Sequence, residues 1–171
     1  IFAGNQRSFG DNSINSKSII SNKNLNKILF FNNKSGIISV ESGILLSQIL
    51  KVVSADGWIL PVMPGSKYVS VGGIIANNVI GKNSIKNQLK FHILEITLID
   101  QNGKIIKCSK KHNKKIFDLT VGGFGLTGSV ISAKLKLKKI KSPLILQKII
   151  NFDSSNKFFK LIKKVKKFEY N

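Results

Sequence analysis

The sequence is poor in the residues that build metal centres and disulfide frameworks. Its 171 residues include one cysteine, Cys108, and two histidines, His92 and His112. A single cysteine excludes an internal disulfide and any multi-cysteine metal site, so we expect no metal centre and a reducing compartment. No apolar run approaches the ~18 residues of a membrane span. No signal-peptide pattern is visible, although a missing true N-terminus would hide one.

Acidic residues are scarce as well. Eight acidic side chains face 28 basic ones, which gives a formal charge of +20. The imbalance grows along the chain, because residues 1–103 hold 10 basic and 5 acidic side chains and residues 104–171 hold 18 and 3. Every basic residue except Arg7 is lysine, and the abundance of lysine, asparagine and isoleucine is typical of an AT-rich genome. Codon bias does not explain the missing acids, so attraction to a polyanion or an anionic membrane surface stays open.

The apolar pattern predicts a mixed α and β domain. We expect a strand within residues 36–43, a helix from 44 to a stop at Gly57, and a hairpin around Asn102 and Gly103. A short helix over 113–119 and a strand over 127–140, with leucines alternating with lysines, complete the pattern. Residues 1–16 read as a loop. Pro143 marks a boundary, and residues 156–168 have the spacing of a basic amphipathic helix.

Both ends of the chain indicate a fragment of something larger. The sequence begins at Ile1 rather than methionine and stops soon after its lysine-rich tail begins.

One glycine pattern is a false lead. Gly123, Gly125 and Gly128 satisfy G-x-G-x-x-G, which in a dinucleotide-binding unit follows a strand, opens a helix and precedes an acidic residue. Here a predicted helix precedes the pattern, a predicted strand follows it, and lysines fill the downstream region. We therefore reject a Rossmann site and expect these glycines to let a loop fold tightly against a neighbour.

A second glycine-rich stretch, VMPGSKYVSVGGIIANN, has the composition of a phosphate site. Pro64 and Gly65 form a turn, Ser66 and Ser70 offer hydroxyl donors, and a double glycine precedes IIANN, where we expect a helix to begin. Unpaired N–H groups at such a point bind phosphate well. The plain alternative is a glycine-rich turn packed against a neighbour, and these residues alone favour neither.

A further loop shifts that balance. AGNQRSFGDNS, residues 3–13, again combines glycines with small donors and contains the only arginine of the chain, whose planar fork suits a phosphate. Arg7 has a plain alternative as a surface residue, but its isolation among 27 lysines favours a use of its geometry. Two such loops predict a diphosphate held between them.

Together these motifs resemble the FAD-binding domain of the vanillyl-alcohol-oxidase type of flavoenzyme, in particular the decaprenylphosphoryl-ribose 2-oxidase group. RSFGDNS resembles that group's R-S-Y-G-D-N loop, PVMPGSKYVSVGGIIANNVIGKN resembles its P-V-x-P-G-T block, and TVGGFGLTGSV resembles its T-V-G-G-x-G-L-T-G segment. The three motifs occur in order between about residues 2 and 138. The resemblance implies an α+β fold, with residues 1–141 as an N-terminally truncated FAD-binding domain and 142–171 as the start of a substrate domain.

The resemblance also implies roles for individual residues. One loop would wrap the FAD diphosphate, a second segment would supply backbone and hydroxyl donors to the same groups, a third would lie along the flavin, and a valine would meet the cofactor from the last strand. Relatives that bind flavin covalently carry a histidine at the position of Arg7, so the FAD should be non-covalent. The loop around the diphosphate comprises Gly4, Asn5, Gln6, Arg7, Ser8, Phe9, Gly10, Asp11 and Asn12. The donor segment comprises Gly65, Ser70, Val71, Gly72 and Gly73. The segment along the flavin comprises Asn77, Asn78, Val79 and Ile80, and the valine of the last strand is Val130.

Three positions depart from the family pattern or match it in isolation. Gln6 replaces a usual glycine, which predicts a different loop path or weaker binding. Ile80 replaces a histidine on the substrate side of the flavin, which affects substrate choice or activity. His92 matches a histidine of relatives, but a lone histidine is more often packed or exposed than catalytic. The residues that grip substrate lie largely in the later domain of such enzymes, so we name no catalytic residue.

The resemblance implies an FAD-linked oxidoreductase that oxidises a CH–OH group of a sugar or polyprenyl-phospho-sugar by hydride transfer to flavin N5. An aldonolactone or alditol oxidase is the alternative within the class. A lysine-rich module for nucleic acid or anionic surfaces is the alternative outside it, and the near absence of arginine and of interleaved aromatics disfavours it.

The partners expected are a small-molecule or lipid-linked sugar substrate and a reductase or epimerase subunit, without nucleic acid. The expected location is the cytoplasm, with peripheral contact at the inner membrane as an option. For the tail, a solvated face of the next domain's first helix is favoured over membrane contact.

Overall fold

The computed structural model describes residues 1–81 and 88–164, and within this part of the chain a five-stranded antiparallel sheet forms the framework. Strands alternate buried and exposed side chains, so one face of the sheet is apolar and the other carries lysines such as Lys134 and Lys136. In spatial order the strands are β3 (Ile28–Asn32), β4 (Ile37–Glu41), β8 (Ser129–Lys136), β6 (Ile93–Ile99) and β7 (Ile105–Cys108).

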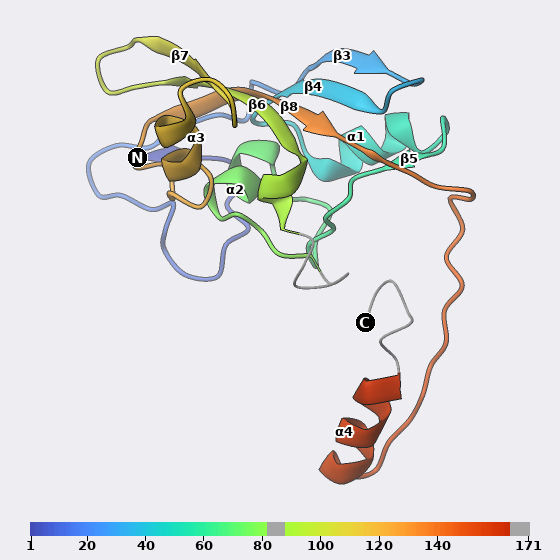
Figure 1. Cartoon of the computed structure of the whole chain (residues 1–171). Helices are drawn as coiled ribbons and strands as arrows, with labels where there is room; N and C mark the ends of the chain where they lie inside the picture. The colour runs from blue at the N-terminus through green and yellow to red at the C-terminus, as the bar shows by residue number, and fades with distance from the viewer. Residues whose placement is uncertain (82–87, 165–171) are drawn as a thin grey trace.

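Two helices lie on the same side of this sheet (Figure 1). Helix α1 (Leu46–Val53) buries Leu46, Ile49 and Val53, which confirms the predicted helix and its apolar face. Helix α2 (Val71–Ala76) buries Val71 and its two isoleucines against the same core. The predicted start of α2 was wrong, because the double glycine lies inside the helix rather than before it. Ser70 is the N-cap residue, so the helix begins at Val71, earlier in the sequence than predicted.

The hairpin around Asn102 and Gly103 is confirmed as β6 and β7. It leads into α3 (Lys114–Thr120), the predicted short helix, and then into the glycine segment before β8. A Cβ at Gly123 would lie 2.0 Å from the Leu119 carbonyl oxygen, and one at Gly128 would lie 2.2 Å from that of Ile99. The expected tight folding of this loop is therefore confirmed. A single 3₁₀ turn, η1 (Leu89–His92), precedes β6.

Two short sheets complete the domain. Strand β1 (Phe2–Ala3) pairs in parallel with β2 (Ile20–Ser21), and β5 (Trp58–Ile59) pairs with β9 (Lys138–Lys139). The sequence predicted residues 1–16 as a loop and gave no sign of β1. It also gave no sign of β3, the edge strand of the main sheet.

Beyond β9 the chain leaves the domain. Figure 1 shows the connection after β9 running away from the sheet to α4 (Ser155–Lys164), which confirms a helix in the tail as far as residue 164. Most large apolar side chains of this connection are exposed, for example Leu144 and Leu146. The proposed domain boundary near residue 141 stays a prediction. No helix in the described part of the chain is long and apolar enough to cross a membrane.

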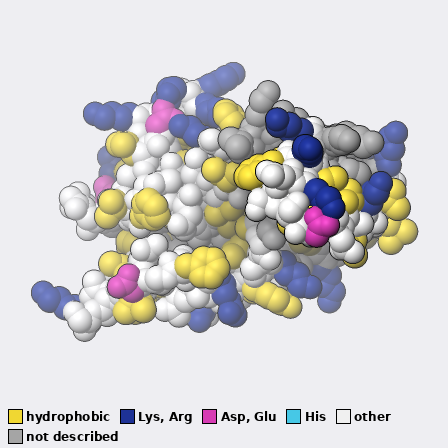
Figure 2. Space-filling view, turned by 90° about the horizontal axis from the view of Figure 1, so that it is seen from below, with side chains coloured by type: hydrophobic (Ala, Val, Ile, Leu, Met, Phe, Trp, Pro, Cys, Tyr) yellow, Lys and Arg dark blue, Asp and Glu magenta, His cyan; other side chains and the backbone are white. Residues whose placement is uncertain are grey.

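The charge imbalance is visible on the molecular surface. Figure 2 shows many dark blue lysine side chains and few magenta carboxylates on the face seen from below. Asp118 pairs with two lysines, with Lys90 at 2.9 Å and with Lys114 one helical turn earlier. These contacts connect η1 to α3.

Candidate functional site

The main cavity lies between the two loops that the sequence singled out. It has a volume of about 600 Å³, within the usual range of small-molecule and cofactor sites. The loop of residues 4–13, the turn at Pro64 and Gly65, helix α2 and Phe124 surround it. Its lining residues include twelve of those predicted to bind the cofactor: Gly4, Asn5, Gln6, Arg7, Ser8, Phe9, Asn12, Gly65, Ser70, Gly73, Asn77 and Val79.

Direct contacts hold these two loops together. The Asn5 side-chain amide donates a hydrogen bond to the Tyr68 carbonyl oxygen at 2.7 Å. Gly4 approaches Ser70 so closely that a Cβ on Gly4 would lie 2.2 Å from Ser70 Oγ. The pairing of β1 with β2 fixes the start of the first loop. The predicted juxtaposition of the loops is therefore confirmed as a feature of the fold.

The first loop presents a row of unpaired backbone donors. Among the described residues, no backbone N–H of residues 5–13 donates a hydrogen bond to another protein group. The loop is largely exposed, so water can bind these N–H groups and leaving them without a protein partner costs little free energy. They are therefore free to bind a ligand. Arg7 is the only charged side chain among the described residues that line the cavity. A loop of free N–H groups beside one guanidinium suits a diphosphate.

The start of α2 is built differently from the sequence expectation. The Val71 N–H donates to the Ile44 carbonyl at 3.0 Å, the Gly72 N–H donates to the Ser42 carbonyl at 2.7 Å, and the Gly73 N–H donates to Ser70 Oγ at 3.3 Å. Val71 is also fully buried. These N–H groups are therefore occupied inside the protein. For Gly72, the plain alternative of close packing describes the structure, because its Cβ would lie 3.1 Å from that of Ser42.

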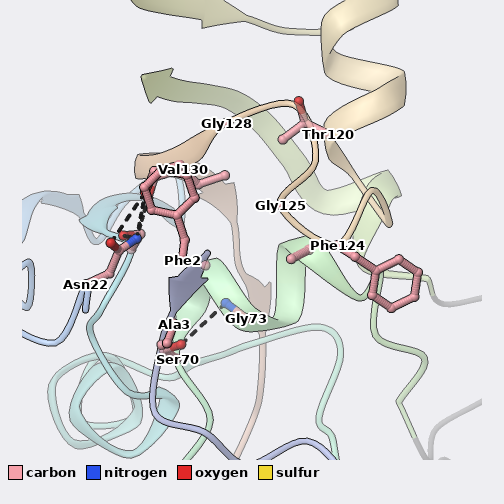
Figure 3. A pocket seen from close by; sticks show the side chains of 15 residues that line it. Phe2, Ala3, Asn22, Ser70, Gly73, Thr120, Phe124, Gly125, Gly128 and Val130 are labelled. Carbon is pink, nitrogen blue, oxygen red and sulfur yellow. Dashed lines mark hydrogen bonds between the residues drawn. The ribbon is translucent and has the colours of Figure 1, made fainter. Parts of the chain in front are cut away.

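A smaller cavity of about 70 Å³ adjoins the first, and both share Phe2, Gly4, Ser70 and Phe124 among their lining residues. Asn22 connects its walls, since its side-chain amide donates to Ser129 Oγ at 3.0 Å, to the Val130 carbonyl at 3.1 Å and to Ser42 Oγ at 3.2 Å. Figure 3 shows Asn22 and Phe2 beside Val130. None of the described lining residues of this cavity carries a charge. It therefore suits an uncharged polar group rather than a phosphate.

Gln6, which stands where the family pattern has a glycine, has a left-handed backbone. Its φ is +49°, in the left-handed region that glycine enters without steric cost. Glycine would adopt this conformation without strain, and the expectation of a different loop path or weaker binding stays a prediction. The side chain of Gln6 makes this conformation strained.

Five predicted residues lie outside both cavities. Val71 is in the core, and Asn78 has φ of +41° and accepts a hydrogen bond from the Lys90 N–H at 3.3 Å. Ile80, which follows α2, is exposed and forms an isolated antiparallel bridge with Gln88. Gly10 and Asp11 lie at the exposed tip of the first loop. Their roles in binding the cofactor stay predictions.

Several lining residues were missed by reasoning from the sequence. Phe124 sits within the glycine segment that was considered only for its glycines, and Ser129 directly precedes the predicted Val130. The sequence around Phe124 and Ser129 gave only a weak signal that these two residues line a cavity. Phe2, Asn22 and Ser42 belong to segments that reach the site only through sheet pairing, so no local pattern marks them.

The isolated cysteine and histidine lie away from the cavities. Burial raises the pKa of the Cys108 thiol to about 11, and the nearby charge of Glu95 adds to the shift. Burial lowers the pKa of His92, as does the charge of Lys110, and its buried Nε2 has no hydrogen-bond partner among the described residues. Within residues 1–81 and 88–164 no three His, Cys, Asp or Glu side chains gather as a metal site.

The fold is a domain of mixed α and β structure with a cavity of cofactor size. The family described as the FAD binding domain matches residues 1–109, which is more than half of the chain. The chain therefore belongs to the FAD binding domain family of vanillyl-alcohol-oxidase-type flavoenzymes, and FAD is its cofactor.

Curated relatives agree with this assignment. The chain is 31% identical over 140 residues to decaprenylphosphoryl-β-D-ribose oxidase of Mycolicibacterium smegmatis, covering 80% of this chain and 30% of that protein. It is 28% identical to D-lactate dehydrogenase of Anaerostipes hadrus, covering 77% and 28%, and 24% identical to L-gulonolactone oxidase of Bos taurus, covering 76% and 31%. The chain thus spans about a third of the length of these relatives or slightly less.

Proposed function

We propose that this chain is the cofactor-binding part of an FAD-dependent oxidoreductase that oxidises a CH–OH group of a sugar or polyprenyl-phospho-sugar. The observation that carries the cofactor part of the proposal is the row of free N–H groups in residues 5–13, beside Arg7 and against Ser70. The substrate part rests on similarity to decaprenylphosphoryl-β-D-ribose oxidase.

The residues present fit the dinucleotide. Free N–H groups and the Arg7 guanidinium would hold the diphosphate in the larger cavity, where no described lining residue is acidic. The absence of a side chain at Gly4 leaves room for Ser70 Oγ, which lines both cavities and caps α2. The uncharged smaller cavity would accept a neutral part of the molecule.

FAD, when bound, would supply the hydride acceptor for oxidation of the CH–OH group at its N5. The described residues hold and orient it. Asn77 and Val79 also line the larger cavity, and the resemblance assigns them to the flavin part of the cofactor. The Asn5 hydrogen bond to Tyr68 and the pairing of β1 with β2 hold the first loop beside α2, which limits its reorganisation when a ligand binds.

The proposed attachment is non-covalent. Neither cavity has a histidine or cysteine among its described lining residues, and Arg7 occupies the place where covalently linked relatives carry a histidine. Cys108 is fully buried and its raised pKa leaves almost no thiolate. These observations support a cofactor that leaves when the protein is denatured.

The test of the proposed function is the visible spectrum of the whole protein before and after acid precipitation. A band near ~450 nm that leaves with the supernatant is expected of a non-covalent flavin. A band that stays with the pellet would contradict the non-covalent attachment. A colourless protein that takes up no added FAD would contradict the cofactor itself.

The substrate class needs a second measurement. Similarity to L-gulonolactone oxidase favours an aldonolactone or alditol oxidase as the alternative. Under anaerobic conditions, bleaching of the flavin band by a phosphoribosyl polyprenol and not by aldonolactones or alditols would support the proposal. The reverse pattern would support the alternative.

The lysine-rich surface makes anionic partners a separate expectation. A lipid-linked substrate, contact of the tail with a membrane surface and a reductase or epimerase subunit stay predictions. The absence of nucleic acid among the partners also stays a prediction.

A further inference from the structure

Phe124 has a strained backbone. Its φ is +51°, a conformation that aromatic residues rarely adopt. The Phe124 N–H donates to the Ala76 carbonyl at 3.0 Å, and the Gly122 N–H donates to the Ile75 carbonyl at 3.0 Å, so the loop is tied to the end of α2. Gly125 follows with φ of +81°. The loop therefore fixes Phe124 where glycine or asparagine would be more stable.

The Phe124 side chain has little packing in the described part of the chain that would offset this strain. The Phe124 side chain is 63% exposed and lies outside the buried core. Its ring has no aromatic or cationic partner among the described residues. Strained residues that persist without a packing reason occur mainly at binding and catalytic sites.

The position of Phe124 indicates what the ring contacts. Phe124 lines both cavities and so stands where they join. Figure 3 shows its ring turned away from the group formed by Phe2, Asn22 and Val130. A flat apolar ring at this place suits contact with another flat aromatic ring, and FAD contains two such ring systems.

We propose that Phe124 is a positioning residue for FAD, whose side chain packs on a ring of the bound cofactor at the junction of the two cavities. This inference rests on the proposed function and goes further, because it assigns a cofactor contact to a residue outside the glycine and serine motifs. The left-handed backbone of Phe124 is then the means by which the ring is held out from the loop.

The proposal predicts opposite effects on stability and on binding. Phe124→Gly removes both the strain and the ring, so the apoprotein should melt at the same temperature or higher while FAD binds roughly 3- to 10-fold more weakly. Phe124→Tyr keeps the ring and should stay within about twofold of wild type. A residue that merely packs within the protein would show a lower melting temperature and unchanged affinity.

The measurement is a titration of the whole apoprotein with FAD, followed by flavin fluorescence, together with thermal unfolding without FAD. Asn113→Gly is the matched control, because Asn113 also has positive φ, at 48°, but lines neither cavity. Unchanged FAD affinity in Phe124→Gly, with normal binding by wild type, would overturn the role of Phe124 alone. Failure of wild type to bind FAD would overturn the proposed function and this inference together.

Discussion

Replacement of Gly4 by alanine tests whether contact between the two loops shapes the site. The new Cβ would lie 2.2 Å from Ser70 Oγ and 3.3 Å from Ser70 Cβ. The Ser70 hydroxyl accepts the Gly73 N–H, so it can turn aside only by giving up that hydrogen bond. If it turns, the cap on α2 is lost, at a cost of about 1 kcal/mol. If it cannot turn, overpacking costs roughly 1–3 kcal/mol. We expect Gly4→Ala to lower the free energy of unfolding by about 2 kcal/mol and to weaken FAD binding.

A double-mutant cycle isolates this contact. Ser70→Ala removes the atom that clashes and should cost about 1 kcal/mol through the lost cap. Because Gly4→Ala then meets only a Cβ, the double variant should be destabilised by about 1–2 kcal/mol rather than the sum of the single effects. Chemical denaturation of the three variants gives the coupling, and FAD titration gives the affinity. Additive losses would refute the reasoning, because they would mean that Gly4 and Ser70 do not share space.

Other predictions concern residues at and away from the site. Gln6→Gly removes the strain at φ of +49° and should stabilise the protein by about 1 kcal/mol in chemical denaturation without weakening FAD binding. Cys108, with a pKa of about 11, should react with a thiol reagent at pH 8 about 100-fold more slowly in the native protein than when unfolded; equal rates would contradict its burial. Hydrogen bonds from Lys114 and then Lys90 hold the pKa of Asp118 below its ordinary value, so stability from its charge is present at neutral pH and lost as the pH falls through the lowered pKa. Asp118→Asn should therefore lower the melting temperature at pH 7, and this difference should vanish in strong acid.

The sequence predicted the elements whose signals are local. Asn102 and Gly103 identify the hairpin because few other dipeptides make so tight a turn, and alternating leucines and lysines identify β8. Strand β1 has two residues and exists only through its pairing with β2, 18 positions away at Phe2 and Ile20. No periodicity can be read from two residues, so that pairing was not predictable from a single sequence.

The site divides in the same way. Gly4, Arg7 and Ser70 were predicted because glycines, arginine and hydroxyls near one another suit phosphate chemistry. Asn22 was not predicted, because it reaches the smaller cavity through hydrogen bonds to Ser129 and Val130, which lie 107 and 108 positions later in the chain. The sequence also could not predict which glycine leaves its N–H free for a ligand and which one packs inside the protein. The Gly72 N–H is occupied because the fold places the Ser42 carbonyl beside it.

The two glycine-bearing segments, residues 5–13 and the start of α2, therefore have different roles, although their compositions are alike. At Gly72 the missing side chain brings α2 against the end of β4, and the N–H is used in holding it there. In residues 5–13 no backbone N–H donates such a bond among the described residues, so these donors stay available for a ligand. A rigid wall beside an open row of donors is the arrangement expected of a site that binds a diphosphate tightly, because the wall fixes where the donors point. The position of Ser70 between the two, packed against Gly4 and capping α2, makes it the residue through which a change in one loop should reach the other.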